Sequence, residues 1–258
     1  MDRDYLSSPQ VVAASKGLVC ARLLTYESAD EAKVLTSFFV GRSGALENTT
    51  FVVVAPDGKT ALTRGGRSPD MVLPGRSSRD GGDSGGLAQL LTSTAAKYPR
   101  TASASLEPPL LPCLVDARRG LDVAACDLLP LAIVVAKDAA ERKAIDDALR
   151  PLVWADERAG RILYAPATSA ADLRAVSGVS ATARLVVVQA DAFGLKGAVL
   201  AQTDDATPAS LEKTLDEGLR RWKPVKKDVR QQIAEGRREG LHWTPEIPVT
   251  DPGEQHAR

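Results

Sequence analysis

Residues 49–60 of this 258-residue chain read Thr49-Thr50-Phe51-Val52-Val53-Val54-Ala55-Pro56-Asp57-Gly58-Lys59-Thr60. The uninterrupted aromatic and β-branched run from Phe51 to Val54 is typical of a fully buried strand. The Pro-Asp-Gly that follows it is typical of a tight turn. The segment therefore predicts a central strand that leaves the core through a turn.

The same pattern recurs in the second half of the chain. Residues 184–191 read RLVVVQAD, residues 193–197 supply a Gly-containing turn, FGLKG, and residues 198–201 give a second apolar run, AVLA. A helix is expected after each hairpin, because apolar residues recur at helical spacing through Leu87 and Leu91 in the first half and through Leu211 and Leu215 in the second. One architecture used twice is the simplest interpretation.

Working outward from the two hairpins predicts an order of elements in each half. The first half predicts a helix from Pro9, a strand over 18–26, a helix over 29–40, the hairpin and a final helix. The second predicts a strand over 129–135, a helix capped by Asp138 with Glu141 three residues on, a variant of the capping box, a strand over 161–164, a short helix from Ser169, the hairpin and a helix from Pro208 to Trp222. The second order is strand, helix, strand, helix, strand, strand, helix.

This is the element order of the thioredoxin-like proteins, which both halves resemble. The predicted fold class is α/β, with two thioredoxin-like three-layer α/β/α units, the first incomplete at its N-terminus. The predicted divisions are residues 1–100 (the truncated first domain), 101–112 (a Ser/Ala/Pro-rich linker), 113–224 (the second domain) and 225–258 (a charged helix with an extended tail pinned by Trp243 and Ile247).

The opening Met1-Asp2-Arg3-Asp4-Tyr5-Leu6 resembles the segment that follows the Cys-x-x-Cys motif in some thioredoxin-like proteins. In that family a cis-proline faces the dithiol, and its backbone contacts substrate; the matching positions are Thr49 and Ala183. A cis bond before a residue other than proline costs roughly 2.5 to 4 kcal/mol, so trans peptides are expected at both. The resemblance thus implies partner binding near Thr49, Thr50 and Ala183 without a dithiol site.

Three cysteines are the candidate catalytic residues. Cys20 falls on the predicted strand over 18–26, where a thiol is commonly a small apolar group, although Arg22 shares its predicted sheet face. Cys113 and Cys126 could form a disulfide worth about 3 kcal/mol in an oxidising compartment, or stay as thiols in a reducing one. Both states remain open.

Arginines mark one further candidate site. Arg64 and Arg67 flank Gly65-Gly66 at the start of a polar loop that also holds Arg76 and Arg79. Guanidinium groups and loop amides together can bind an anion, whereas the alternative is an ordinary solvated loop. We predict Arg64 and Arg67 as partner-binding residues.

Bulk composition narrows the function classes. Lys plus Arg and Asp plus Glu each number 33, so no basic field indicates nucleic acid or a membrane surface. No apolar run approaches the roughly 20 residues that span a bilayer, and a cytoplasmic location is expected. No metal site or cofactor motif is recognised.

Two functions follow from the resemblance. The first is a non-catalytic thioredoxin-like binding or scaffold protein in a redox or stress-related pathway, with a protein or peptide partner. The second is a thiol-disulfide oxidoreductase that uses cysteines upstream of Met1, or Cys20, or the Cys113/Cys126 pair. A homodimer is a further possibility, because an incomplete first sheet would leave an open edge.

Overall fold

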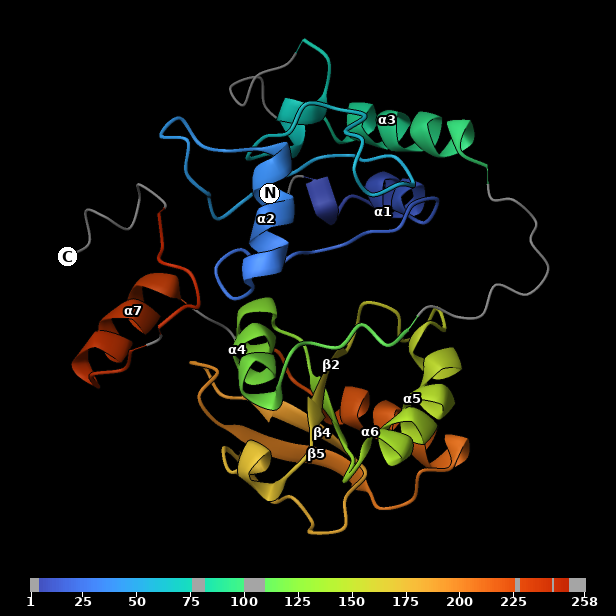
Figure 1. The fold of residues 1–258 in the computed structure, drawn as a ribbon, viewed down its shortest axis with the longest axis vertical. Helices are drawn as coiled ribbons and strands as arrows, with labels where there is room; N and C mark the ends of the chain where they lie inside the picture. The colour runs from blue at the N-terminus through green and yellow to red at the C-terminus, as the bar shows by residue number, and fades with distance from the viewer. Residues whose placement is uncertain (1–4, 76–81, 100–109, 226–227, 243, 251–258) are drawn as a thin grey trace. The chain divides into compact units, whose positions relative to one another are not determined.

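The computed structural model describes residues 5–75, 82–99, 110–225, 228–242 and 244–250 (Figure 1). The chain divides into two compact units. The first comprises Met1–Ser103 together with Trp243–Arg258, and the second comprises Ala104–His242. The fold class is α/β, as predicted, because helices accompany a mixed five-stranded sheet.

In its described residues the regular secondary structure of the first unit is helical, and the remainder is irregular. Its elements are α1 (Pro9–Ser15), α2 (Ala29–Phe38), the 3₁₀ helix η2 (Pro69–Val72) and α3 (Ser84–Lys97). The core gathers Tyr5 and Val11 with side chains from η2, α3 and the segment around Val53. The predicted helices after Ser8, after Ser28 and through Leu87 are confirmed, and Pro9 stands at the first helical position of α1.

The strand predictions for the first unit fared differently. The strand over 18–26 is wrong: these residues form no strand, and Val19 is 98% exposed. The run Phe51 to Val54 makes only two isolated bridges, Phe51 to Gly66 and Val54 to Ala61, and only Val53 is buried. Apolar composition alone favours a strand, but a strand must also pair with a neighbouring strand through backbone hydrogen bonds. In the described residues, the segment from Phe51 to Val54 pairs only with the other side of an irregular hairpin.

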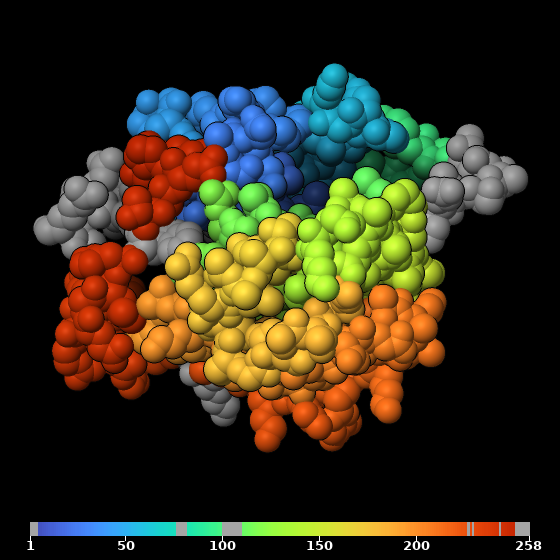
Figure 2. Space-filling model, turned by 60° about the horizontal axis from the view of Figure 1, so that its bottom comes forward, coloured from blue at the N-terminus to red at the C-terminus, as the bar shows by residue number. Residues whose placement is uncertain are grey.

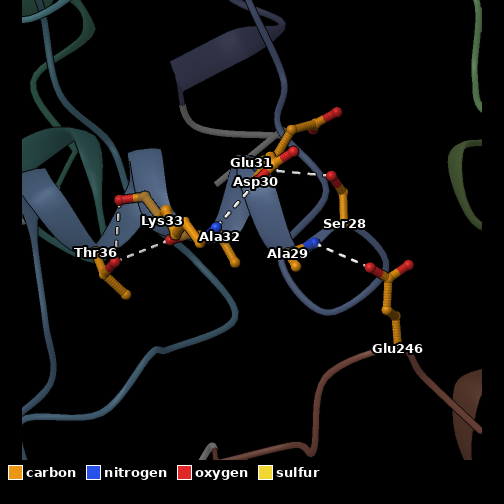
Figure 3. Close-up of polar contacts among 8 residues, drawn as sticks. All are labelled: Ser28, Ala29, Asp30, Glu31, Ala32, Lys33, Thr36 and Glu246. Atoms are coloured by element: carbon orange, nitrogen blue, oxygen red, sulfur yellow. Dashed lines mark hydrogen bonds and ion pairs between the residues drawn. The ribbon is translucent and has the colours of Figure 1, made fainter.

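The C-terminal segment lies against α2 within the first unit. The Ser28 hydroxyl accepts a hydrogen bond from the Glu31 amide at 3.4 Å, and the Glu246 carboxylate accepts one from the Ala29 amide at 3.3 Å (Figure 3). The Ile247 amide donates to the Tyr26 carbonyl at 3.0 Å. Ile247 therefore pins the tail as predicted, whereas Trp243 lies outside the described residues.

The second unit is built on a sheet with the order β2-β1-β4-β5-β3. Its strands are β1 (Leu131–Val135), β2 (Leu163–Ala167), β3 (Val176–Ser177), β4 (Leu185–Ala190) and β5 (Gly197–Thr203). β1 pairs parallel with β2 and antiparallel with β4, and β4 pairs antiparallel with β5. β1 has four buried residues and β4 has five, which matches the apolar sequence of both strands.

Helices cover both faces of this sheet (Figure 1). One face packs against α4 (Ala117–Asp127) and the 3₁₀ helix η3 (Ala170–Leu173). The other packs against α5 (Ala139–Val153) and α6 (Pro208–Arg221). The order β1, α5, β2, η3, β4, β5, α6 matches the predicted order for residues 129–222, with the short β3 added. The charged helix predicted after residue 225 is α7 (Val229–Arg238).

Helix α4 was not predicted. Asp116 caps it by accepting a hydrogen bond from the Arg119 amide at 2.8 Å, and Leu121, Ala124 and Ala125 face the core at helical spacing. The signal was present in the sequence, but small alanines and four charged residues make its apolar stripe faint.

Candidate functional site

Two groups of side chains in the second unit are candidates for function, and both involve α5. The first lies at the beginning of that helix. Asp138 accepts a hydrogen bond from the Glu141 amide at 2.8 Å, and the Glu141 carboxylate accepts one from the Lys137 amide at 2.7 Å. Asp138 is therefore the N-cap as predicted, whereas Glu141 accepts the amide of the residue before the cap and not that of Asp138, as a capping box would require.

Glu141 also joins α5 to the segment that precedes β4. Its Oε1 lies 2.6 Å from Arg184 Nη1, and both side chains are about a quarter exposed. The Arg184 carbonyl in turn accepts a hydrogen bond from the Val135 amide at 2.9 Å, at the end of β1. We call this place the corner and define it as residues 137–141 and 181–184.

The corner contains the predicted partner-binding residue Ala183. Ala183 is 4% exposed, so its side chain is inside the protein. Its neighbours are open to solvent: the exposed corner residues are Lys137, Asp138, Ala139, Ala140, Ala181 and Thr182. All described peptide bonds are trans, as expected at Thr49 and Ala183. Residues 137–141, which lead into the first turn of α5, read Lys-Asp-Ala-Ala-Glu and carry no thiol.

The second group surrounds Cys113. Arg142 Nη2, on α5, donates a hydrogen bond to Cys113 Sγ at 3.0 Å, and Arg142 Nε contacts Asp146 Oδ1 at 2.7 Å. Burial raises the pKa of the Cys113 thiol, and the nearby Arg142 guanidinium opposes that rise without cancelling it. The thiol is therefore protonated near neutral pH.

A groove of about 400 Å³ runs along the outer side of α5, and Arg142 is one of its lining residues. Its walls combine apolar residues of the incoming segment with charged residues of the helix, namely Leu110, Leu111, Ala139, Arg142, Lys143, Asp146, Asp147 and Arg150. The charges are paired within the helix, since Asp146 contacts Arg142, and Asp147 contacts Lys143 and Arg150. The solvent-facing surface of α5 is visible in Figure 2 (yellow-green).

The Cys113 and Cys126 thiols are not joined in a disulfide. Cys113 packs against the sheet face that α5 and α6 cover, whereas Cys126 is exposed on the last turn of α4, the helix that covers the opposite face. The sheet lies between the two helices, so the structure favours the separate-thiol alternative for this pair.

Cys20 lies in neither group. It is exposed and falls in the irregular segment after α1, with its thiol 4.0 Å from the Ser15 carbonyl. The prediction that it occupies a core strand is wrong, for the same reason that the strand over 18–26 is wrong.

The first-unit candidates are brought together only in part. Arg67 contacts Glu47 Oε2 at 2.9 Å and donates to Asn48 Oδ1 at 3.1 Å, and Thr49 donates to the same amide oxygen at 3.1 Å. The Thr50 hydroxyl is buried and has no hydrogen-bond partner in the described part of the chain. Arg64 is exposed, while Arg76 and Arg79 lie outside the described residues. Arg67 thus already holds an acidic partner, which weakens the case for an anion site.

Sequence reasoning missed Arg142, Tyr164 and Arg184. Tyr164 lies on β2 and is the bridge partner of Cys113. The contacts that these residues make with Cys113 and Glu141 join positions 29 or more residues apart, so no local sequence pattern predicts them. The one available signal was Glu141, whose capping role placed it at the corner.

Among the described residues no three His, Cys, Asp or Glu side chains gather as metal ligands, and no helix has the length and apolar character needed to cross a membrane. A scan against protein-family models, a search of curated proteins and a search of solved structures each found no match to this chain.

Proposed function

We propose that the second unit is a thioredoxin-like domain that binds an extended protein or peptide segment at the corner and does not catalyse dithiol exchange. The observation that carries this proposal is the Glu141–Arg184 ion pair, which holds the first turn of α5 against the segment before β4. In the thioredoxin-like resemblance this is where a dithiol faces the residue that contacts substrate. Here a capped helix and an ion pair stand in that place.

The element order supports the assignment. From β1 to α6 the second unit runs strand, helix, strand, helix, strand, strand, helix, with η3 as the second helix. We confine the assignment to the second unit, because the described residues of the first unit contribute helices and two isolated bridges.

The chemistry of the corner also suits a binding role. The exposed residues include three alanines, Ala139, Ala140 and Ala181, which leave room for a main chain to approach. The ion pair holds the two segments together, and the corner has no thiol of the kind that thiol-disulfide exchange requires. A peptide would gain its affinity from main-chain hydrogen bonds and from contacts with these small side chains.

A steric block at the corner tests the proposal. Ala140 is the second residue of α5 and is exposed, so Ala140→Trp adds a large side chain there without displacing the core. Ala159 is the matched control, because it is exposed and follows the opposite end of α5 from the corner. We expect the full chain to bind members of an array of random-sequence peptides lacking cysteine, and A140W to abolish that binding while A159W retains it. Absence of binding, or binding unchanged in A140W, would contradict the proposal.

A further inference from the structure

Residues 244–250, here called the tail, form neither helix nor strand, and their burial alternates along the chain. The half-buried positions are Pro245, Ile247 and Val249, and the exposed residues between them are Glu246 and Pro248. This alternation is typical of an extended segment that lies with one side against a surface. The two prolines lack an amide hydrogen, so the tail docks through separate contacts and not as a strand in a ladder.

Two carbonyl groups of the first unit accept hydrogen bonds from the tail. The Ile247 amide donates to the Tyr26 carbonyl at 3.0 Å, and the Thr250 hydroxyl donates to the Leu46 carbonyl at 2.5 Å. The Tyr26 hydroxyl donates to the same Leu46 carbonyl at 3.3 Å, so the two acceptors belong to one place on the unit. We call this place, together with the start of α2, the tail surface and define it as residues 26–29 and 46.

The start of α2 supplies a third contact, which favours a negative charge. The Ala29 amide donates to the Glu246 carboxylate at 3.3 Å, beside Ser28, whose hydroxyl caps the helix (Figure 3). The acidic residues of the first turn, Asp30 and Glu31, make contacts of their own elsewhere. The amides of a helix N-terminus favour an anion, and here a carboxylate from 217 positions further along the chain takes that place.

The tail also connects the two units a second time. The chain passes from the first unit to the second between residues 103 and 104, and it returns between residues 242 and 243. The contacts of the tail therefore decide whether the end of the second unit stays attached to the first. A segment without helix or strand structure can be released from such contacts without unfolding either unit.

We propose that the tail surface is a docking site for an extended segment of a partner protein, and that the tail occupies it when that partner is absent. The fitting segment has an acidic residue followed by an apolar one, with proline on both sides of this pair, as in the tail sequence Thr-Pro-Glu-Ile-Pro-Val-Thr. The surface contributes main-chain groups of Tyr26, Ala29 and Leu46, which recognise this pattern in segments of different sequence.

The consequence of docking is a change in how the units are connected. The partner segment displaces the tail, and the return connection from the second unit to the first opens. This inference concerns the first unit and is independent of peptide binding at the corner.

Displacement of the tail by synthetic peptides tests the proposal in the full chain. Hydrogen exchange of the Ile247 amide is followed by NMR with the tail peptide Thr-Pro-Glu-Ile-Pro-Val-Thr and with a second peptide of the same pattern, Ser-Pro-Asp-Val-Pro-Leu-Ser. A tethered segment competes at an effective concentration of about 1 mM, so either peptide at about that concentration should speed exchange at least about threefold. Thr-Pro-Lys-Ile-Pro-Val-Thr is the matched control and should have no effect. The readout lies in the tail, so peptide bound at the corner does not contribute.

Ala29→Pro tests the contact at the start of α2. Proline removes the amide that donates to Glu246, yet it is favoured at the first position of a helix, which Ala29 occupies. Ser28 already has the extended backbone that a following proline requires. Loss of a hydrogen bond to a charged group should speed exchange at Ile247 about tenfold without any peptide. Ala29→Ser keeps the amide and should match wild type.

Four results would overturn the proposal. Three of them are exchange at Ile247 that either acidic peptide leaves unchanged, a lysine peptide that acts as strongly as the acidic ones, and no effect of Ala29→Pro. The fourth is a wild-type dimer, detected by light scattering, that Ile247→Asp dissociates, because the occupant of the tail surface would then be the tail of a second copy.

Discussion

The Glu141 carboxylate and the Arg184 guanidinium meet at 2.6 Å, and they tie the first turn of α5 to the residue that precedes β4. Glu141 also accepts the Lys137 amide, so one side chain makes a local contact at the start of α5 and a contact to a segment distant in the sequence. We predict that Glu141→Ala lowers the free energy of unfolding of the second unit by about 1 to 2 kcal/mol, through loss of the cap and of a partly buried ion pair.

Hydrogen exchange of the β1 and β4 peptides measures this effect, because those strands report the second unit alone. Lys143→Ala is the control: its partner contact, to Asp147, is exposed, and its loss should change the free energy by less than about 0.5 kcal/mol. Equal effects of the two substitutions would show that the corner contact is an ordinary surface pair.

Two buried tyrosines should respond in opposite directions when their hydroxyls are removed. Tyr164 has a hydroxyl without a partner, so Tyr164→Phe should leave the second unit unchanged or stabilise it by up to about 1 kcal/mol. Tyr5 donates to Asp70 and accepts from the Asp83 amide, so Tyr5→Phe should cost the first unit about 1 to 3 kcal/mol. Hydrogen exchange in β2 and α3 reports the two units separately. A clear loss in Tyr164→Phe would mean that its hydroxyl has a partner.

Gly218 should resist replacement although it lies within a helix. A Cβ at this position would lie 2.4 Å from a methyl carbon of Val187 on β4, so the backbone of α6 lies directly against a side chain of the sheet. Alanine favours helix by about 1 kcal/mol over glycine, but the overlap should outweigh that gain and give a net loss of about 1 to 3 kcal/mol.

The Gly218 prediction carries its own control. Val187→Ala alone leaves a cavity, yet it should rescue part of the Gly218→Ala loss, so the double variant is more stable than the sum of the single effects. The free energies of unfolding of wild type, the two single variants and the double variant are measured by chemical denaturation. Strictly additive losses would argue that Gly218 and Val187 are not in contact.

The stability of the second unit should depend on pH through Cys113. Its folded pKa is raised, so the folded protein keeps the thiol proton at a pH where the unfolded chain loses it. The contribution is therefore complete below the unfolded pKa of about 8.5 and is lost as the pH rises toward the folded value. Across about pH 8 to 10, wild type should lose more stability than Cys113→Ala. Cys126→Ala, which removes an exposed thiol, should follow wild type.

Local signals account for what could be predicted of this fold. Helix starts are marked by short local patterns, namely Ser28, Asp138 with Glu141, and Pro208. The apolar runs of β1 and β4 are long enough to identify buried strands. The segment over 18–26 carries a similar apolar run, yet it forms no strand, because strand formation depends on a partner elsewhere in the chain.

The candidate site shows the same limit. Ala183 could be placed near the start of the second-half helix by resemblance, but the Arg184 contact that fixes it could not. Cys113 was a candidate as a thiol, whereas its neighbours Arg142 and Tyr164 come from α5 and β2 and meet it only in the folded unit. Cys20 and Cys126 share the chemistry of Cys113 and lack those neighbours, so residue type alone could not separate the three.

The most direct test of the central claim is reduction of insulin disulfides by the full chain with dithiothreitol as electron donor. A binding domain whose corner carries Glu141 and Arg184 in place of a dithiol should leave the rate at that of dithiothreitol alone. An acceleration that disappears in Cys113→Ser or Cys126→Ser would contradict the account and identify the protein as a thiol-disulfide oxidoreductase.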